Sequence, residues 1–153
     1  MKRILALSSS VVAAAFLATA GSAMHSSATH SKPRSGQLHI TKECGDYHGQ
    51  VGEFCTITSS NISVIEPGMR VFYFAVPGPD GVLDSDIALS SGHGGATVGH
   101  VVLDLTTAQG RVTFLGGTGR FRGFRAKARV SVDKDGVWHW DGTYGFSRRN
   151  DDD

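Results

Sequence analysis

The sequence predicts an all-β domain, an eight-stranded antiparallel β-barrel with little helix outside its N-terminal segment. Between residues 37 and 146, apolar and polar residues alternate with period two, which is the pattern of a half-buried strand. Glycine-centred turns interrupt this alternation roughly every ten residues, as in an all-β sandwich or barrel. No part of this segment sustains a 3.6-residue period, and eight strands in this length are typical of a small closed barrel.

The composition supports a single folded domain. The 153-residue chain has 20 glycines, only 4 prolines and 40 % hydrophobic residues, which indicates many turns and too much apolar material for general disorder. A chain of this length can bury one hydrophobic core without a structural metal. The length excludes a large multidomain enzyme.

The N-terminal segment, residues 1–23, has the features of a secretory signal peptide. A basic tripeptide precedes an almost uncharged apolar run over residues 4–17, and small residues follow, so we expect cleavage after Ala20 or Ala23. The run is too short for a membrane span. We therefore expect a secreted protein, extracellular or periplasmic. Cleavage after Ala23 would leave 13 basic and 14 acidic residues, a formal charge of −1, which excludes a globally basic nucleic-acid binder.

The remaining chain divides into a linker, the barrel domain and a tail. Residues 24–36 are small and polar with no apolar period, so they predict a flexible linker, and residues 148–153 form a charged tail. Within the domain of residues 37–147 the expected strands are 38–44, 53–62, 70–76, 83–89, 97–106, 111–115, 124–132 and 137–146. The segments that separate them, rich in Gly, Pro, Asp and Ser, are 45–52, 66–68, 77–81, 90–96, 109–110, 116–123 and 134–136.

Period two also assigns side chains to the two faces of each strand. In residues 124–132 the small Ala126 and Ala128 oppose three basic side chains, and in the last strand Trp138 and Trp140 share one face. Small residues facing aromatics either pack closely in a filled core or leave room for a ligand in the barrel. The candidates to line such a lumen are Phe72, Phe74, Phe114, Ala126, Ala128, Trp138, Trp140 and Tyr144.

Cys44 and Cys55 are the two cysteines of the chain. Export would deliver them to an oxidising compartment, where such a pair is normally joined, so we expect a disulfide across a hairpin. The competing interpretations are a nucleophilic cysteine, which needs a histidine partner in space, and a metal site. The spacing of the pair does not match a metal-binding CxxC knuckle.

Glu53 is a candidate general base. It shares a strand face with Cys55, and if that face points inwards, an unpaired carboxylate would have a raised pKa. The alternative is a solvated position at the barrel rim. No Gly-x-Ser-x-Gly elbow or HExxH helix occurs, and the spacing of His93 and His100 fits no standard ligand pattern, so we expect neither a common hydrolase nor a metal site.

Basic residues cluster in the second half of the domain. Six of them fall between Leu105 and Val132 with no acidic residue among them: Arg111, Arg120, Arg122, Arg125, Lys127 and Arg129. An anion-binding surface has this pattern, and so does a solvated strand face balanced by Asp84, Asp86 and Asp104 on other strands.

The sequence GGTGRFRGF at residues 116–124 resembles the glycine hairpin of dirigent proteins and of allene oxide cyclase-like barrels. Residues 52–61 and 83–86 look like the corresponding strands of small exported bacterial relatives. The resemblance implies an eight-stranded antiparallel barrel, trimeric in many plant members, whose apolar lumen holds a lipid or phenolic intermediate while it cyclises or couples.

Three functions follow as hypotheses. The first is a secreted barrel that binds a small hydrophobic or phenolic molecule in its lumen and guides its cyclisation or coupling, as a cyclase or isomerase without cofactor. The second is a non-catalytic extracellular protein that binds an anionic partner through the basic strands between Arg111 and Arg129. The third is an isomerase with Glu53 as base. An aromatic-lined void would favour the first, an exposed basic strip the second, and an inward Glu53 the third. We expect no nucleic-acid partner, and the resemblance implies a homotrimer.

Overall fold

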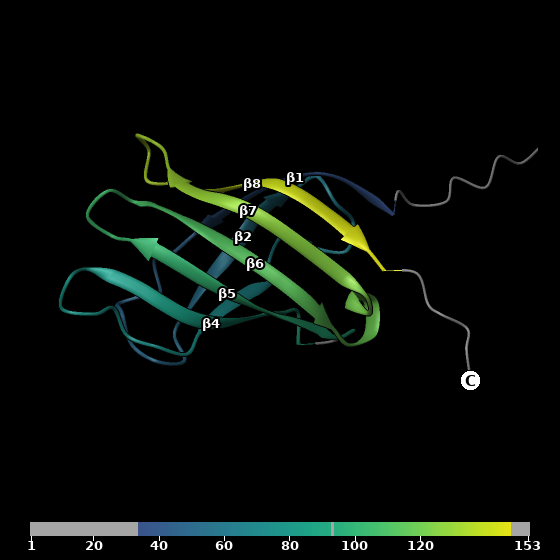
Figure 1. Ribbon diagram of the computed structural model, residues 1–153, viewed down its shortest axis with the longest axis horizontal. Coiled ribbons are helices and arrows are strands. Elements are labelled where there is room, and N and C mark those ends of the chain that lie inside the picture. Colours follow the sequence, from purple (N-terminus) through teal and green to yellow (C-terminus); the bar gives the residue numbers. More distant parts are fainter. Residues whose placement is uncertain (1–33, 93, 148–153) are drawn as a thin grey trace, which may run out of the picture. The chain divides into compact units, whose positions relative to one another are not determined.

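The protein folds into a closed barrel of eight antiparallel strands, which confirms the predicted fold class (Figure 1). The structure, a computed structural model, describes residues 34–92 and 94–147. The strands are β1 Ser35–Glu43, β2 Phe54–Ser60, β3 Arg70–Tyr73, β4 Val82–Ser90, β5 Ala96–Asp104, β6 Gln109–Gly117, β7 Phe124–Val132 and β8 Trp138–Phe146. They follow one another around the barrel in chain order, and β1 pairs with β8 to close it.

The chain enters the barrel slightly before the predicted start at residue 37. Ser35 already pairs with Gly145 of β8, and the backbone N–H of Phe146 donates to the carbonyl of Arg34 at 2.7 Å. The predicted signal peptide, most of the predicted linker and the tail of residues 148–153 lie outside the described residues. In the part of the chain that is described, no helix is long and apolar enough to cross a membrane.

Side chains from all eight strands fill the interior. On each strand the buried residues alternate with exposed ones, as in β7, where Phe124, Ala126 and Ala128 point inwards. The largest side chains meet in one aromatic cluster, in which the ring centroid of Phe114 lies 5.5 Å from that of Trp140 and 6.1 Å from that of Phe124. Interior side chains of small barrels normally pack in this way.

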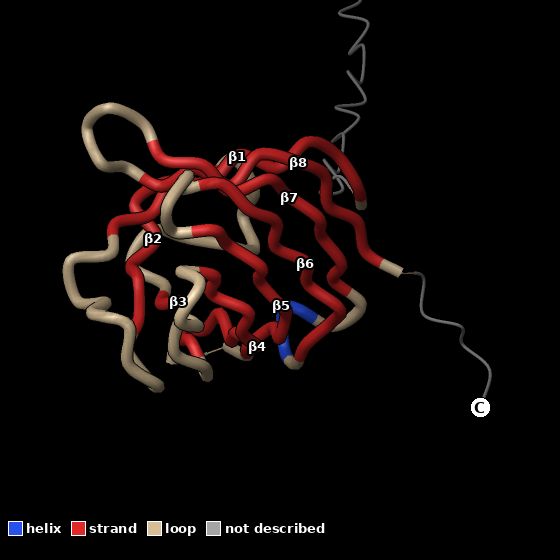
Figure 2. The backbone as a smooth tube through the Cα atoms, turned by 60° about the vertical axis from the view of Figure 1, so that its left-hand side comes forward, coloured by secondary structure: helices blue, strands red, loops and turns tan. Residues whose placement is uncertain are grey.

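A short 3₁₀ helix, η1 (Gly119–Phe121), connects β6 to β7 and is drawn in blue in Figure 2. It contributes Phe121, which is fully buried and has its ring centroid 5.7 Å from that of Phe124. The backbone N–H of Arg120 donates to the carbonyl of Gly94 at 3.1 Å, so η1 also holds the loop between β4 and β5.

β5 changes register against β6 and approaches it closely at Gly99. The shift lies between Val98 and Gly99, and Gly99 pairs with Phe114. A Cβ atom at Gly99 would collide with the carbonyl oxygen of Thr113 and would lie 2.8 Å from the Phe114 ring. This position therefore needs glycine because no other residue leaves room for the neighbouring strand.

Cys44 and Cys55 form a disulfide, as the sequence predicts. The bond joins the residue that follows β1 to the second residue of β2, across the turn-rich loop between these two strands. In a chain-entropy model a crosslink over so short a loop stabilises the fold by roughly 3 kcal/mol.

Candidate functional site

Six of the eight residues proposed to line the lumen lie on the inner face of the barrel. Phe114, Ala126, Ala128 and Trp140 are buried there, and Trp138 and Tyr144 are half-buried on the same face of β8, packed against the core.

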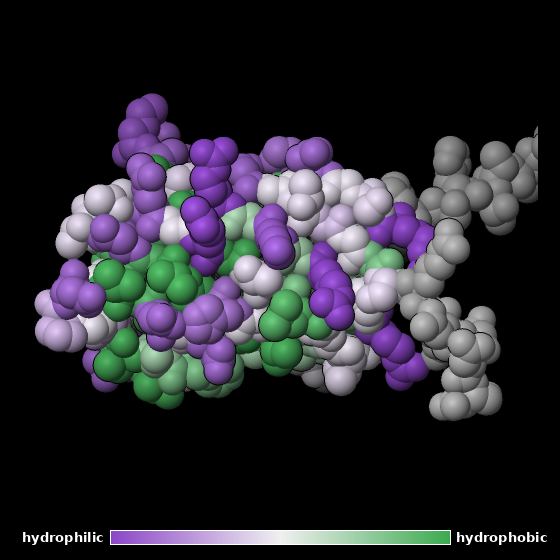
Figure 3. Space-filling view, viewed as in Figure 1, coloured by the Kyte–Doolittle hydropathy of each residue, from purple (hydrophilic) through white to green (hydrophobic). Residues whose placement is uncertain are grey.

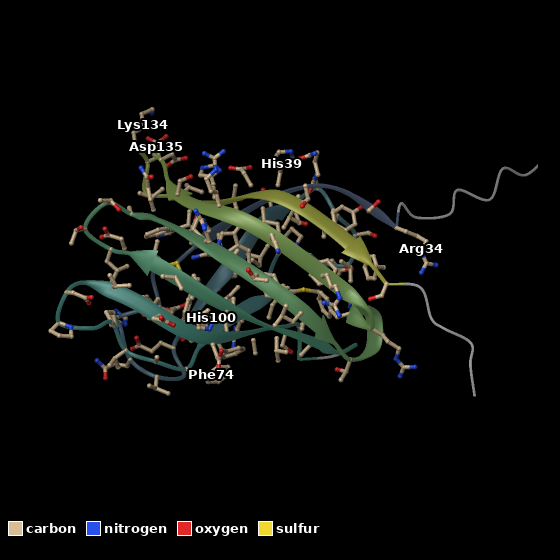
Figure 4. The ribbon with its side chains drawn as sticks, viewed as in Figure 1. Arg34, His39, Phe74, His100, Lys134 and Asp135 are labelled. Carbon is tan, nitrogen blue, oxygen red and sulfur yellow. A yellow bond between two sulfur atoms is a disulfide. The ribbon has the colours of Figure 1, made fainter. Side chains whose placement is uncertain are left out.

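Phe72 and Phe74 do not line the lumen, so this part of the prediction is wrong. The inward positions of β3 are Val71 and Tyr73, which places Phe72 on the outer face, where its ring lies 5.5 Å from that of Phe54. Phe74 follows the strand and is 51 % exposed (Figure 4). Residues 71–76 are apolar at almost every position, so the alternation there does not determine which face is buried.

Glu53 lies in the loop before β2, as the alternative of a rim position expects, and the hypothesis of an inward base with a raised pKa is wrong. Its carboxylate accepts hydrogen bonds from the backbone N–H groups of His48 at 2.6 Å and Gln50 at 2.9 Å. These bonds stabilise the charged form and hold the pKa of Glu53 below its usual value. Glu53 therefore orders the loop before β2, and nothing in this arrangement equips it as a base.

The outer face of β6 and β7 carries a row of cations, which we call the basic strip: Arg111, Arg125, Lys127 and Arg129. All four side chains are exposed, and register places Arg111 opposite Arg129. In Figure 3 strongly hydrophilic side chains follow β7 across the face that Figure 1 presents. Of the other two basic residues of the sequence cluster, Arg120 is bound elsewhere, 2.8 Å from the carboxylate of Glu66.

A surface groove of about 300 Å³ runs along this face. Lys127 lies at one end of the groove between its cross-strand neighbours, Thr113 on β6 and Thr143 on β8, and Arg125 lies at the other end, opposite Gly145. The complete lining is Thr113, Phe114, Leu115, Arg125, Ala126, Lys127, Thr143, Tyr144 and Gly145. The groove thus combines two cations with two threonine hydroxyl groups.

The acidic residues expected to balance the basic strip are bound elsewhere. Asp84 and Asp86 both bind the ring of His100, at 2.9 and 3.0 Å. Asp104 accepts hydrogen bonds from Thr106 and Thr107 in the turn after β5.

The acid nearest in register to the basic strip is Asp141, opposite Arg129. Its carboxylate binds Nδ1 of His39 at 2.8 Å. Among the residues that the structure describes, none forms an ion pair with a member of the basic strip.

The sequence interpretation missed Lys42, which is buried inside the barrel. Lys42 is the third inward residue of β1 after Leu38 and Ile40, and it is 2 % exposed. Its Nζ lies 5.1 Å from the ring centroid of Trp138 and 5.6 Å from that of Trp140. The signal was present in the alternation, since a lysine occupies the apolar phase of the strand.

The amine of Lys42 touches both sulfur atoms of the disulfide. Its Nζ lies 3.2 Å from Sγ of Cys44 and 3.6 Å from Sγ of Cys55. No carboxylate within the described ranges pairs with it. Burial lowers the pKa of Lys42 to about 7 because desolvation disfavours the ammonium form, while the aromatic faces around it favour the cation.

Tyr73 completes this inner cluster from β3. Its hydroxyl donates to Sγ of Cys55 at 3.5 Å, and its ring lies 4.6 Å from that of Tyr47 in the loop before β2. Burial raises the pKa of Tyr73, so its hydroxyl is a neutral donor throughout the physiological range. The hydroxyl of Tyr47 and Nε1 of Trp140 are buried without a partner in the described structure.

Histidines and acids do not gather into a metal centre in the described ranges, where no group of three or more His, Cys, Asp or Glu could hold an ion. His93 lies outside these ranges.

Neither a protein-family model, nor a curated protein, nor a solved structure matches the chain.

Proposed function

We propose that the protein binds an acidic polysaccharide through the groove on the outer face of β6, β7 and β8. One observation carries this proposal. The four cations of the basic strip are exposed and unpaired within the described structure, and two of them line the groove.

The spacing of the cations suits a linear polyanion. Alternate residues of a strand project from the same face about 6.6 Å apart, so Arg125, Lys127 and Arg129 present charges at regular intervals along β7. Directly opposed residues on neighbouring strands have Cβ atoms roughly 5 Å apart, which adds Arg111 beside Arg129. A chain of regularly spaced carboxylate or sulfate groups can contact several of them at once.

The remaining groups of the groove favour a sugar polymer over a nucleic acid. Thr113 and Thr143 offer hydroxyl groups that donate to and accept from sugar hydroxyls. The sequence pI of about 7.9 is lower than is usual for nucleic-acid-binding domains. Export, which the N-terminal sequence predicts, would bring the protein to extracellular glycans.

Binding to heparin and to polygalacturonate, measured by titration calorimetry at several salt concentrations, tests the proposal. The double variant Arg125→Gln/Lys127→Gln should bind at least tenfold more weakly and show a shallower salt dependence, because fewer counterions are displaced. The matched control is Lys134→Gln, which removes an exposed cation from the turn after β7. Equal affinities of the wild type and the double variant, or preferential binding of single-stranded DNA, would disprove the proposal.

The hypothesis of a small hydrophobic or phenolic ligand in the lumen gains no support from the described residues. Side chains fill the interior, and where Ala128 lies opposite Gly142 the strands are so close that a Cβ atom at Gly142 would collide with the backbone of β7.

A further inference from the structure

Lys42 lies against the disulfide, where its ammonium form has no strong acceptor. A disulfide sulfur is a weak hydrogen-bond acceptor, so the ammonium form of Lys42 is poorly satisfied at 3.2 and 3.6 Å from Cys44 and Cys55. A thiolate in the same place would be a strong, charged acceptor. The surroundings of the sulfur atoms thus stabilise the reduced pair more than the oxidised pair.

The two cysteines differ in exposure, and this difference decides which sulfur atom an external thiolate attacks first. Cys44 is half-buried and Cys55 is 1 % exposed, so Cys44 is the more accessible of the two to an external thiolate. Attack on Cys44 makes Cys55 the leaving group. Two donors already contact Sγ of Cys55, the amine of Lys42 at 3.6 Å and the hydroxyl of Tyr73 at 3.5 Å.

We propose that the Cys44–Cys55 bond is a thiol–disulfide exchange centre that oxidises dithiols, with Lys42 and Tyr73 holding the Cys55 thiolate as it leaves. This activity is independent of the basic strip, which lies on the outer face of other strands.

The reaction balances with a dithiol as reductant. A substrate thiolate attacks Sγ of Cys44, the bond between Cys44 and Cys55 breaks, and its electron pair stays on Cys55. The second substrate thiol loses its proton and attacks the substrate sulfur of the mixed disulfide, which releases Cys44 and a substrate disulfide. The substrate loses two electrons and the protein gains them. One of the two substrate protons resides on Cys44, and the other protonates the neutral amine of Lys42 beside the Cys55 thiolate.

The state of the lysine in the oxidised protein supports this scheme. Because burial lowers its pKa to about 7, a large fraction of the Lys42 amine is neutral near neutral pH, and a thiolate that forms beside it favours its protonation. The titratable groups that contact the sulfur atoms are Lys42 from β1 and Tyr73 from β3. Behind them Tyr47 packs on Tyr73 and feels the charge of Glu53, and the remaining neighbours on β8 are uncharged tryptophans.

Redox equilibration of the oxidised protein in glutathione buffers, with the reduced fraction counted by thiol alkylation and mass spectrometry, tests the proposal. Lys42→Met should make reduction at least tenfold less favourable, about 30 mV for this two-electron couple. Tyr73→Phe should have a smaller effect of the same sign, and the control Lys134→Met should have none. A Lys42→Met protein that is reduced as easily as the wild type, or more easily, would overturn the proposal.

A second measurement needs no variant and decides the matter even if Lys42→Met does not fold. In the reduced wild-type protein, ultraviolet thiolate absorbance followed against pH should show one cysteine ionising at least a full pH unit below the ordinary thiol value of about 8.5. If both thiols ionise at or above that value, the cluster does not stabilise a thiolate and the disulfide is only a structural crosslink.

Discussion

At the scale of single residues, Lys42 is, among the described residues, the ionisable side chain that folding buries most completely. It occupies an inward position of β1 that the barrel otherwise fills with apolar side chains, and three aromatic rings and two sulfur atoms surround its amine. Because the pKa of Lys42 in the folded state is about 7 against 10.5 for the free side chain, the unfolded chain binds more protons between these two values.

The stability of the protein should therefore rise with pH in this window. One proton corresponds to 1.36 kcal/mol per pH unit, so the free energy of unfolding should increase by roughly 2 kcal/mol between about pH 7 and about pH 9. The raised pKa values of Tyr47 and Tyr73 act only at higher pH. Urea unfolding across this range checks the prediction.

The matched variant is Lys42→Met, which keeps the apolar stem and removes the titrating group. Its stability should not rise across the window, and it should exceed that of the wild type most clearly near neutral pH. A wild-type profile that is flat, or a variant that keeps the same slope, would show that the charge of Lys42 is not what couples folding to pH.

Single residues also show which pairings and side-chain orientations can be predicted from the sequence. The pairing of Cys44 with Cys55 follows from the expected compartment and the cysteine count. The inward orientation of β7 follows from strict alternation. The orientation of Phe72 does not, because apolar residues occupy both faces of β3. Nor does alternation alone reveal what surrounds Lys42, since its neighbours come from β2, β3, β8 and a loop that meet only in the closed barrel.

At the scale of elements, glycines allow neighbouring strands to approach closely because they have no side chain. Gly99 lies at the register shift of β5, and a side chain there would meet the backbone of Thr113 and the ring of Phe114. We expect Gly99→Ala to lower the free energy of unfolding by about 1–3 kcal/mol, the usual cost of overpacking. Thermal and urea unfolding measure this directly.

Gly45 provides the control for this prediction. A Cβ atom added there would meet nothing within 4 Å, so Gly45→Ala should change stability by less than about 0.5 kcal/mol. Equal effects of the two substitutions would mean that the loss of glycine itself, and not the close approach of β5 to β6, determines the result.

The elements themselves could be located well from the sequence. All eight predicted segments overlap the observed strands, and β7 has the predicted bounds, because Gly, Pro and Asp mark the turns between them. The register shift in β5 could not be located, since it depends on which residues of β6 lie opposite. The helix η1 is too short to leave a periodic pattern in the sequence.

At the scale of the whole molecule, barrel closure separates two chemically different faces. The inner face brings a lysine, tyrosines, tryptophans and a disulfide together, while the outer face of β6 and β7 collects cations that have no acidic partner in the described residues. The sequence showed the cluster of basic residues, but not the groove, because strand register is what places Thr113 and Thr143 on either side of Lys127.

The most direct test of the proposed function is to map the binding surface by NMR while heparin or polygalacturonate fragments are added to the isotope-labelled protein. We expect the perturbed backbone and side-chain signals to cluster on the outer face at Arg111, Thr113, Arg125, Lys127 and Thr143, and to return to their free positions as salt is raised. Perturbations spread evenly over the surface, or confined to the turn that carries Lys134, would contradict the proposed function.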